Sequence, residues 1–524
     1  MKIIPLILKD EKGIALVVAL LFLTLLSLLG IAGIITSTTD TKIAGNTLSG
    51  TKALYIAEAG LSRAEAELIN DLNNDQNIAN SSFAATSGTI TITPSSTAFY
   101  NVFSNISFGA GSYTIQFKNY GTAPNYESAI VLVRSTGTGP NSSTVTLERY
   151  LSAENISPWN NAIFAGGGGG GIPITGSTVI AGSIHLLGNG LAPTATVFSN
   201  QTGDVLNSNT GMDATLAGKI AGGTTSDLDA KFRVKNGRVD LTIGSGYIAQ
   251  SSNPFKGIYV TNGIDSNTDG VNDDIIGGDN SGTGQNLYAD KGANSAEAYD
   301  LGDYNITLPS IDTTWMDANS KNLTGTNQYV GPAGNQKGLI AGALELTGDY
   351  KVTGTDYYPN IEQYDGVDWA SSTNGIRYNS VTNVLEIKGI VKVTSLNISD
   401  DITYAGKGTI YVTGTTNIDG NVLPATAASY PTTNVLGVVS TGNMALPSSA
   451  QKLLTGAYYS SGTVTSSKQN ELAGTIVCQN FNITAQVPRI WQVPSLATNL
   501  PPGMPGATPV WVFTEKTWRE ITRD

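Results

Sequence analysis

An uninterrupted apolar run near the N-terminus constrains this chain more than any other feature. Residues 14–39 form a stretch of 26 residues without a charged side chain, and most of them are Leu, Ile, Val, Ala or Gly. Because a helix needs about 20 apolar residues to cross the core of a bilayer, the run predicts a membrane-spanning helix. The apolar region of a cleaved secretory signal is only about 7 to 15 residues long, so the length favours a segment that is retained.

The flanks of this run predict its orientation and its continuation. Lys2, Lys9 and Lys12 precede it, and the positive-inside rule then places the bulk of the chain outside the cytoplasm. Beyond the run, charged residues are interleaved with apolar ones at three- and four-residue spacing, namely Leu54, Ala57, Leu61, Ala64 and Leu68. We therefore predict one long helix over residues 14–75, whose first half spans the membrane.

The helix also carries two short motifs. KIAGN occupies residues 42–46 and ALYIAEAGLSRAEAEL occupies residues 53–68, and a short charged leader ending in Gly13 precedes the apolar run. These features resemble the N-terminal region of the PilX family of type IV pilus minor pilins, over about residues 1–70. The resemblance implies three kinds of partner: other pilins, the prepilin peptidase and the inner-membrane pilus assembly machinery.

The same resemblance implies a path of processing and transfer. Residues 1–13 would be a prepilin-like leader, cut between Gly13 and Ile14. The helix would then be held in membrane lipid through residues 14–39, as a single pass of the inner membrane, until the subunit joins a pilus at the cell surface. A plain single-pass anchor with an uncut leader remains the alternative.

One position departs from the pattern of the resemblance. Most pilins carry a glutamate five residues into the mature chain, where it is thought to meet the N-terminus of a neighbouring subunit, and this chain has Val18 there. A carboxylate in an apolar bundle is costly unless it is paired, so its absence removes a registry contact and leaves the helix apolar. That suits a subunit at a filament tip or in a priming complex. The residues predicted to make the helix contacts of assembly are Val18, Leu54, Leu61 and Leu68.

Composition and periodicity predict a mainly β protein beyond the helix. Gly accounts for 60 of 524 residues and only 13% are charged, against about 25% in a typical soluble domain. Within residues 76–157, four short runs alternate with period two, which predicts a small antiparallel sheet. A long helix followed by such a sheet is an α+β, pilin-like module.

Residues 158–490 are predicted to form a large Gly/Asn-rich β-solenoid-like domain. Short β-prone runs are separated by Gly-rich corners, and IAGSIHL at 180–186 is echoed by IAGALEL at 340–346. A β-sandwich is the alternative. Irregular insertions are expected around residues 190–380, and the Pro-rich segment 491–524 is expected to be extended, with a last strand, and to cap the stack.

The strongest ligand signal is DSNTDGVNDD at residues 265–274. Oxygen-bearing side chains at alternate positions before a glycine reproduce the start of a calcium loop. The candidate calcium ligands are the side chains of Asp265, Asn267, Asp269 and Asp273 and the carbonyl of Val271. The bidentate glutamate of a helix-loop-helix site is missing, so the prediction is a lone loop stiffened by calcium, and the alternative is an unoccupied Asp/Asn turn.

Other chemistry finds less support. The net charge of −12 and scattered basic residues argue against a nucleic-acid partner. The single histidine, His185, rules out an H-E-x-x-H site, and the single cysteine, Cys478, rules out a disulfide within the chain. An aromatic group is compatible with sugar stacking or with loop packing: Tyr357, Tyr358, Tyr364 and Trp369.

These observations predict a minor pilin and no enzyme. The chain is expected to take part in type IV pilus assembly, at the tip, and to display its large β domain for surface contact or adhesion. The alternative is a membrane-anchored cell-surface β-solenoid that binds or cleaves polysaccharide.

Overall fold

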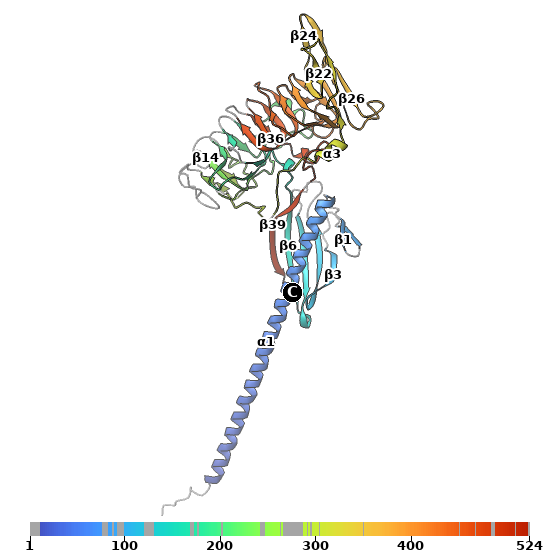
Figure 1. Cartoon of the computed structure of the whole chain (residues 1–524). Helices are drawn as coiled ribbons and strands as arrows, with labels where there is room; N and C mark the ends of the chain where they lie inside the picture. Colours follow the sequence, from blue (N-terminus) through green and yellow to red (C-terminus); the bar gives the residue numbers. More distant parts are fainter. Residues whose placement is uncertain are drawn as a thin grey trace, which may run out of the picture. The chain divides into compact units, whose positions relative to one another are not determined.

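A computed structural model of the chain divides into two compact units, residues 1–155 with 511–524, and residues 156–510 (Figure 1). Each unit is described by itself. The structure describes residues 11–75, 82–85, 88–91, 99–119, 130–167, 172–174, 178–200, 203–241, 247–262, 264–265, 287–290, 292–293, 296–302, 304–348, 350–449, 451–466, 468–483, 488–508 and 510–521.

The first unit begins with helix α1 (Glu11–Asp75), which confirms the single long helix. Its part from Gly13 to Ile69 is long and apolar enough to cross a membrane, and none of its most apolar window, with mean hydropathy 2.9, is buried. Residues 13–48 are exposed throughout, whereas the following turns are packed. The buried side chains of those turns are Ala53, Ile56, Ala57, Leu61, Ala64 and Leu68.

An antiparallel sheet receives the packed turns of α1. Its strand order is β3-β4-β5-β6-β39, and the helix lies on one face with a shared apolar core. The strands are β3 (Tyr100–Phe108), β4 (Gly111–Asn119), β5 (Ile130–Thr138), β6 (Thr144–Asn155) and β39 (Trp511–Ile521); a separate hairpin joins β1 (Ser82–Ala85) to β2 (Gly88–Thr91). A helix followed by a small antiparallel sheet is thus present. The predicted runs correspond to β4, β5 and β6, whereas β3 was not predicted and the fifth strand, β39, comes from residues 511–521.

That fifth strand corrects the expectation for residues 491–524. β39 pairs with β6 from Trp511↔Asn155 to Ile521↔Thr146, so the end of the chain completes the first unit and does not cap the solenoid. The pairing is reinforced by a buried carboxylate. Glu148 on β6 is 1% exposed and accepts hydrogen bonds from Arg134 at 2.6 and 2.8 Å and from Arg519 on β39 at 2.9 and 3.2 Å.

Parallel strands stacked into a solenoid build the second unit, which excludes the sandwich alternative. The first group of strands is β7 (Ile163–Gly167), β8 (Ile172–Ile174), β9 (Val179–Ala181), β10 (Ile184–Asn189), β11 (Thr196–Asn200), β12 (Asp204–Leu206), β13 (Lys231–Val234), β14 (Arg238–Leu241), β15 (Tyr247–Ile248), β16 (Gly257–Val260) and β17 (Ile264–Asp265). Several of these strands fall inside residues 190–380, where irregular insertions were expected.

A second group of strands continues the stack. It comprises β20 (Lys321–Asn322), β23 (Ala343–Leu346), β28 (Val384–Val393), β29 (Ser395–Ile398), β30 (Ile402–Ala405), β31 (Lys407–Val412), β32 (Thr416–Ile418), β33 (Val422–Pro424), β34 (Val435–Ser440), β35 (Met444–Ala445), β36 (Leu453–Ser466), β37 (Glu471–Ile483) and β38 (Arg489–Trp491). Antiparallel hairpin strands are β18 (Tyr288–Ala289), β19 (Gly292–Ala293), β21 (Gln328–Val330), β22 (Lys337–Ile340), β24 (Tyr350–Val352), β25 (Thr355–Tyr357), β26 (Ile361–Tyr364) and β27 (Gly375–Asn379); the short helices are α2 (Ala214–Ala217) and α3 (Thr313–Ala318).

The chain enters this stack in its interior. From β7 it adds β10, β13 and β16 in one direction, then resumes at β20 and returns through β28, β31, β34 and β36 to β37. The last of these, β37, pairs in parallel with β7, so the two groups of strands form one continuous stack. One unbroken row of buried side chains follows these pairings: Val391, Ile410, Val438, Tyr458, Ile476, Ile163, Ile184, Phe232 and Ile258.

The two ends of the second unit also lie side by side. The backbone N–H of Ile156 donates to the carbonyl of Val510 at 2.9 Å. In the first unit, Asn155 and Trp511 are likewise paired on adjacent strands. The solenoid is therefore inserted between β6 and β39, the last two strands of the pilin-like sheet.

Candidate functional site

The exposed part of α1 is the first candidate site. Ile14 is 67% exposed and Val18 is 45% exposed, and each lies on a stretch of helix with no other element packed on it in the described chain. A methyl group added at Gly13, Gly30 or Gly33 would meet nothing within 4 Å. The surface offers apolar contact without directional polar partners, which suits lipid or other apolar helices.

The prediction that Leu61 and Leu68 make subunit contacts is wrong. Leu61 is 2% exposed and Leu68 is fully buried in the core between α1 and the sheet, because they lie on the helix face that the strands cover. Leu54 is partly buried at the edge of that core. The exposed apolar residues on this part of the helix are instead Ile43, Leu48 and Tyr55, which interrupt the polar face and which the periodicity argument overlooked.

The region of the predicted calcium loop gives no test of it. Asp265 ends β17, whereas Asn267, Asp269, Val271 and Asp273 lie outside the described residues. Among the residues that the structure does describe, no group of three His, Cys, Asp or Glu side chains is placed to hold a metal ion. Calcium binding at this loop stays a prediction.

His185 and Cys478 both line the solenoid. His185 is 1% exposed on β10, where its Nε2 lies 2.8 Å from the Tyr299 hydroxyl and its ring packs edge-on against Phe164. Burial raises the pKa of the Cys478 thiol, so this cysteine is held as an unreactive apolar group. Both side chains are therefore buried within the solenoid, and the histidine has a protein partner there.

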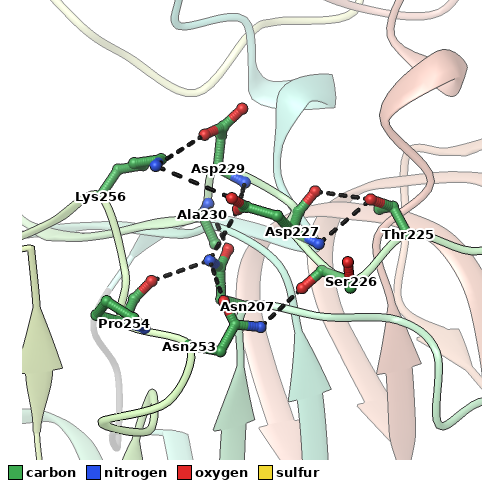
Figure 2. Close-up of polar contacts among 9 residues, drawn as sticks. All are labelled: Asn207, Thr225, Ser226, Asp227, Asp229, Ala230, Asn253, Pro254 and Lys256. Atoms are coloured by element: carbon green, nitrogen blue, oxygen red, sulfur yellow. Dashed lines mark hydrogen bonds and ion pairs between the residues drawn. The ribbon is translucent and has the colours of Figure 1, made fainter.

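A polar cluster near β12 and β13 has a structural role (Figure 2). The Asn207 side chain is 2% exposed, donates to Asp227, Asn253 and the carbonyl of Pro254 at 2.9–3.0 Å, and accepts from the backbone N–H of Ala230 at 2.8 Å. The contacts of this amide are with the protein itself, which pins two turns together. Lys256 lies 3.4 Å from Asp229 and 3.9 Å from Asp227 at the exposed edge of the cluster.

The outward face of β26, β27 and β28 forms a second candidate site, which we call the platform. Antiparallel pairing places Glu362 opposite Arg377, and Arg377 opposite Glu386, so that one row of three charges crosses the three strands. Arg377 lies 3.5 Å from Glu362 and 3.3 Å from Glu386, and the three side chains are 41–53% exposed. Sequence reasoning missed this row because only strand register brings the three residues together.

A groove of about 480 Å³ opens over this row of charges. Its polar lining comes from β21, from β26 to β28 and from the turns beside them: Gln328, Asn360, Glu362, Arg377, Asn379, Thr382 and Glu386. Gln328 is fixed, because its side-chain oxygen accepts from the backbone N–H of Glu362 at 2.9 Å and from Gln363 at 3.0 Å.

The aromatic group splits around the platform. Trp369 packs edge-on against Tyr364, with ring centroids 6.2 Å apart, and the Lys388 and Arg377 cations lie 4.5 and 5.3 Å from its ring. Tyr358 is 38% exposed beside Asn360, and Tyr357 belongs to β25. Tyr364 and Trp369 therefore form one aromatic end of the platform. Their contacts with each other and with Lys388 and Arg377 are those of loop packing.

The long helix docked on a five-stranded antiparallel sheet is a pilin-like fold. Residues 12–62 match the family model described as PilX N-terminal, which confirms the resemblance predicted for this region. Among solved structures, the chain is similar in fold to the competence-associated pilin ComZ from Thermus thermophilus, with a TM-score of 0.52 and 18% sequence identity over 91% of this chain and 98% of that chain. Comparison with curated protein sequences gave no match.

Proposed function

We propose that this chain is a minor pilin of a type IV pilus, cut after Gly13, held in the inner membrane by α1 and then transferred into the filament. The observation that carries the proposal is the division of α1 into an exposed apolar part and a part packed in a pilin-like sheet. The match of residues 12–62 to the PilX N-terminal model supports the same role.

Transfer from membrane to filament is an exchange of apolar surroundings. Residues 14–39 leave lipid and contact the helices of other pilins. Their side chains therefore stay out of water, while pilin helices replace lipid as their neighbours. The prepilin peptidase and the inner-membrane assembly machinery are the further partners. Val18 provides no carboxylate to pair with a neighbour, so the subunit depends on apolar packing for its register.

The solenoid is the part proposed to contact surfaces. Residues 156–510 are inserted in one hairpin of the pilin-like sheet, and a repeating subunit would have to accommodate this insertion at every position of the filament. A place at the tip avoids that demand and leaves the solenoid facing the environment. Adhesion is then the role proposed for it. Calcium, if bound at the loop that begins at Asp265, would stiffen that loop.

Cell fractionation tests the proposal. Cells producing the full chain, with and without prepilin peptidase, are sheared and the filaments are collected. We expect the chain in sheared filaments only when the peptidase is present, and antibodies to the solenoid should label filament ends. A chain that stays in the membrane fraction under both conditions would refute the pilin role, and label along the whole filament would refute the tip.

A further inference from the structure

We infer that the platform on β26, β27 and β28 is a binding site for an uncharged oligosaccharide. The inference deepens the surface-contact role proposed above and rests on it for its biological setting. The site itself is argued from its own residues.

The groove has the size of a small-ligand site and an unusual surplus of directional polar groups. Its volume of about 480 Å³ lies within the range of about 300–1,000 Å³ that is typical of ligand pockets. Carboxylate, guanidinium and amide groups meet in it, and sugar hydroxyls, which both donate and accept, can bond to each of these groups.

Three groups of the groove have spare hydrogen-bonding capacity. The Asn360 side chain accepts from the backbone N–H of Ser380 at 3.1 Å, and that of Asn379 accepts from Val381 and Thr382 at 3.0 and 3.1 Å. Each amide is thus oriented through its oxygen, while within the described chain its nitrogen has no protein acceptor. The Thr382 hydroxyl is also without a protein partner among the described residues. Two oriented amide nitrogens and a hydroxyl therefore face a ligand without reorganisation.

The charged row adds a fork that matches neighbouring hydroxyls. Arg377 forms ion pairs with Glu362 on one side, at 3.5 Å, and with Glu386 on the other, at 3.3 Å, which favour an orientation of its planar group across the strands. The carboxylate oxygens not used by Arg377 accept from hydroxyls. At the far end of the same face, Trp369 and Tyr364 are half-buried rings, and the surface that they offer to a sugar ring is the part of Trp369 and Tyr364 that the cations of Lys388 and Arg377 leave uncovered.

The charge of the groove selects the class of glycan. Glu362 and Glu386 against Arg377 give the lining an excess of one negative charge, and the whole chain carries −12. Lys388 on the same face balances that excess near Trp369, so the platform offers no net positive charge to an acidic polysaccharide, and the preference for a neutral glycan rests on this and on the negative charge of the chain. The shortage of exposed apolar lining argues against a hydrophobic peptide.

Binding to the full chain in detergent tests the inference. The probes are neutral glucan, mannan and N-acetylglucosamine oligomers, with an oligogalacturonate as the acidic arm, measured by calorimetry. Asn360→Asp and Asn379→Asp keep an oxygen that accepts from the backbone, replace each free donor by a carboxylate oxygen and add one negative charge. Arg377→Gln removes the fork. The matched control is Arg489→Gln, since Arg489 is 46% exposed, pairs with Glu471 at 3.0 Å and lines a different polar groove.

We expect at least one neutral oligomer to bind. Arg377→Gln should weaken that binding about tenfold or more, as expected for the loss of a hydrogen bond from a charged group, and each asparagine variant should weaken it about threefold or more, while Arg489→Gln leaves it unchanged. Circular dichroism of each variant should match the parent chain. No binding of any neutral oligomer, tighter binding of the acidic oligomer, or equal binding by all variants would overturn the inference. Those outcomes leave filament incorporation untouched, so the two proposals fail separately.

Discussion

The exposed part of α1 and the platform are both open to solvent, yet they are built in opposite ways. Residues 14–39 of α1 present a mostly apolar surface on which no other element of the described chain packs, whereas the platform presents polar groups already oriented by strand register and hydrogen bonds. Apolar contact is non-directional, so the first surface tolerates a change of partner. Directional bonds demand one geometry, so the second suits a specific ligand. The contrast separates an assembly surface from a recognition surface within one chain.

The largest effect on stability is expected in the part of α1 that packs on the sheet. Leu61→Ala removes a side chain that is 2% exposed and should destabilise the first unit by about 2–5 kcal/mol. Leu26→Ala, at a site that is 64% exposed, should leave that unit unchanged. Hydrogen exchange of the β5 amides in the full chain measures both. Equal effects of the two variants would show that the two parts of α1 do not differ as described.

A charge in the middle of the exposed part should act only in the membrane. Leu26→Lys is expected to cost about 2.5–3.5 kcal/mol of insertion as a membrane-spanning helix, while the protection of the β5 amides and any glycan binding stay as in the parent chain. The membrane-bound fraction after extraction with alkaline carbonate is the readout, and Leu26→Ala is the control. Unchanged membrane retention by the lysine variant would argue against lipid contact along this surface.

Two glycine substitutions test the same difference between the packed and exposed parts of α1, with smaller expected changes in stability. A methyl group on Gly137 of β5 would lie 2.3 Å from the carbonyl oxygen of Ala53 and 2.5 Å from the nitrogen of Ala57, so the helix backbone rests directly on the strand. Gly137→Ala should destabilise the first unit by about 1–3 kcal/mol. Gly33→Ala meets nothing within 4 Å and should stabilise the helix by about 1 kcal/mol. Thermal melts followed at helix wavelengths should move in opposite directions, and a shift of the same sign would contradict the packing.

The smallest effect concerns pH and the loop that carries Trp369. Burial alone would raise the pKa of the Asp365 carboxyl, but hydrogen bonds from Asn374 and Thr373 lower it below its ordinary value of 3.8. A depressed folded-state pKa gives stability that is present above pH 3.8 and is lost as pH falls through the lower folded value. The loop should therefore lose hydrogen-exchange protection in acid. Asp365→Asn should abolish this pH dependence, and a loop with equal protection at both ends of the range would contradict it.

Much of the first unit can be predicted from the sequence, because the patterns that indicate its helix and strands are local. Apolar length and three- and four-residue spacing predict α1, and period-two alternation predicts an antiparallel sheet after it, with runs that correspond to β4, β5 and β6 but not to β3. The fifth strand, Trp511–Ile521, could not be placed, since its partner β6 is separated from it by the entire solenoid. Periodicity also could not tell which helix face the sheet covers, so Leu61 and Leu68 were assigned to subunit contact although they belong to the core.

The solenoid was predictable as a class of fold but not in its chain path. Gly-rich corners and short strands indicate stacking, yet the pairing of β37 with β7 joins residues that are remote in sequence. The platform is hidden for the same reason. Glu362, Arg377 and Glu386 have no recognisable spacing, and antiparallel register alone aligns them across three strands.

The N-terminal residue of the chain recovered from filaments tests the central claim most directly. If the apolar part of α1 is a retained assembly surface, sequencing of the filament-associated chain from cells with active prepilin peptidase should begin at Ile14. A chain that begins at Met1 under these conditions, or one cut beyond residue 39 so that the apolar part is lost, would contradict the account.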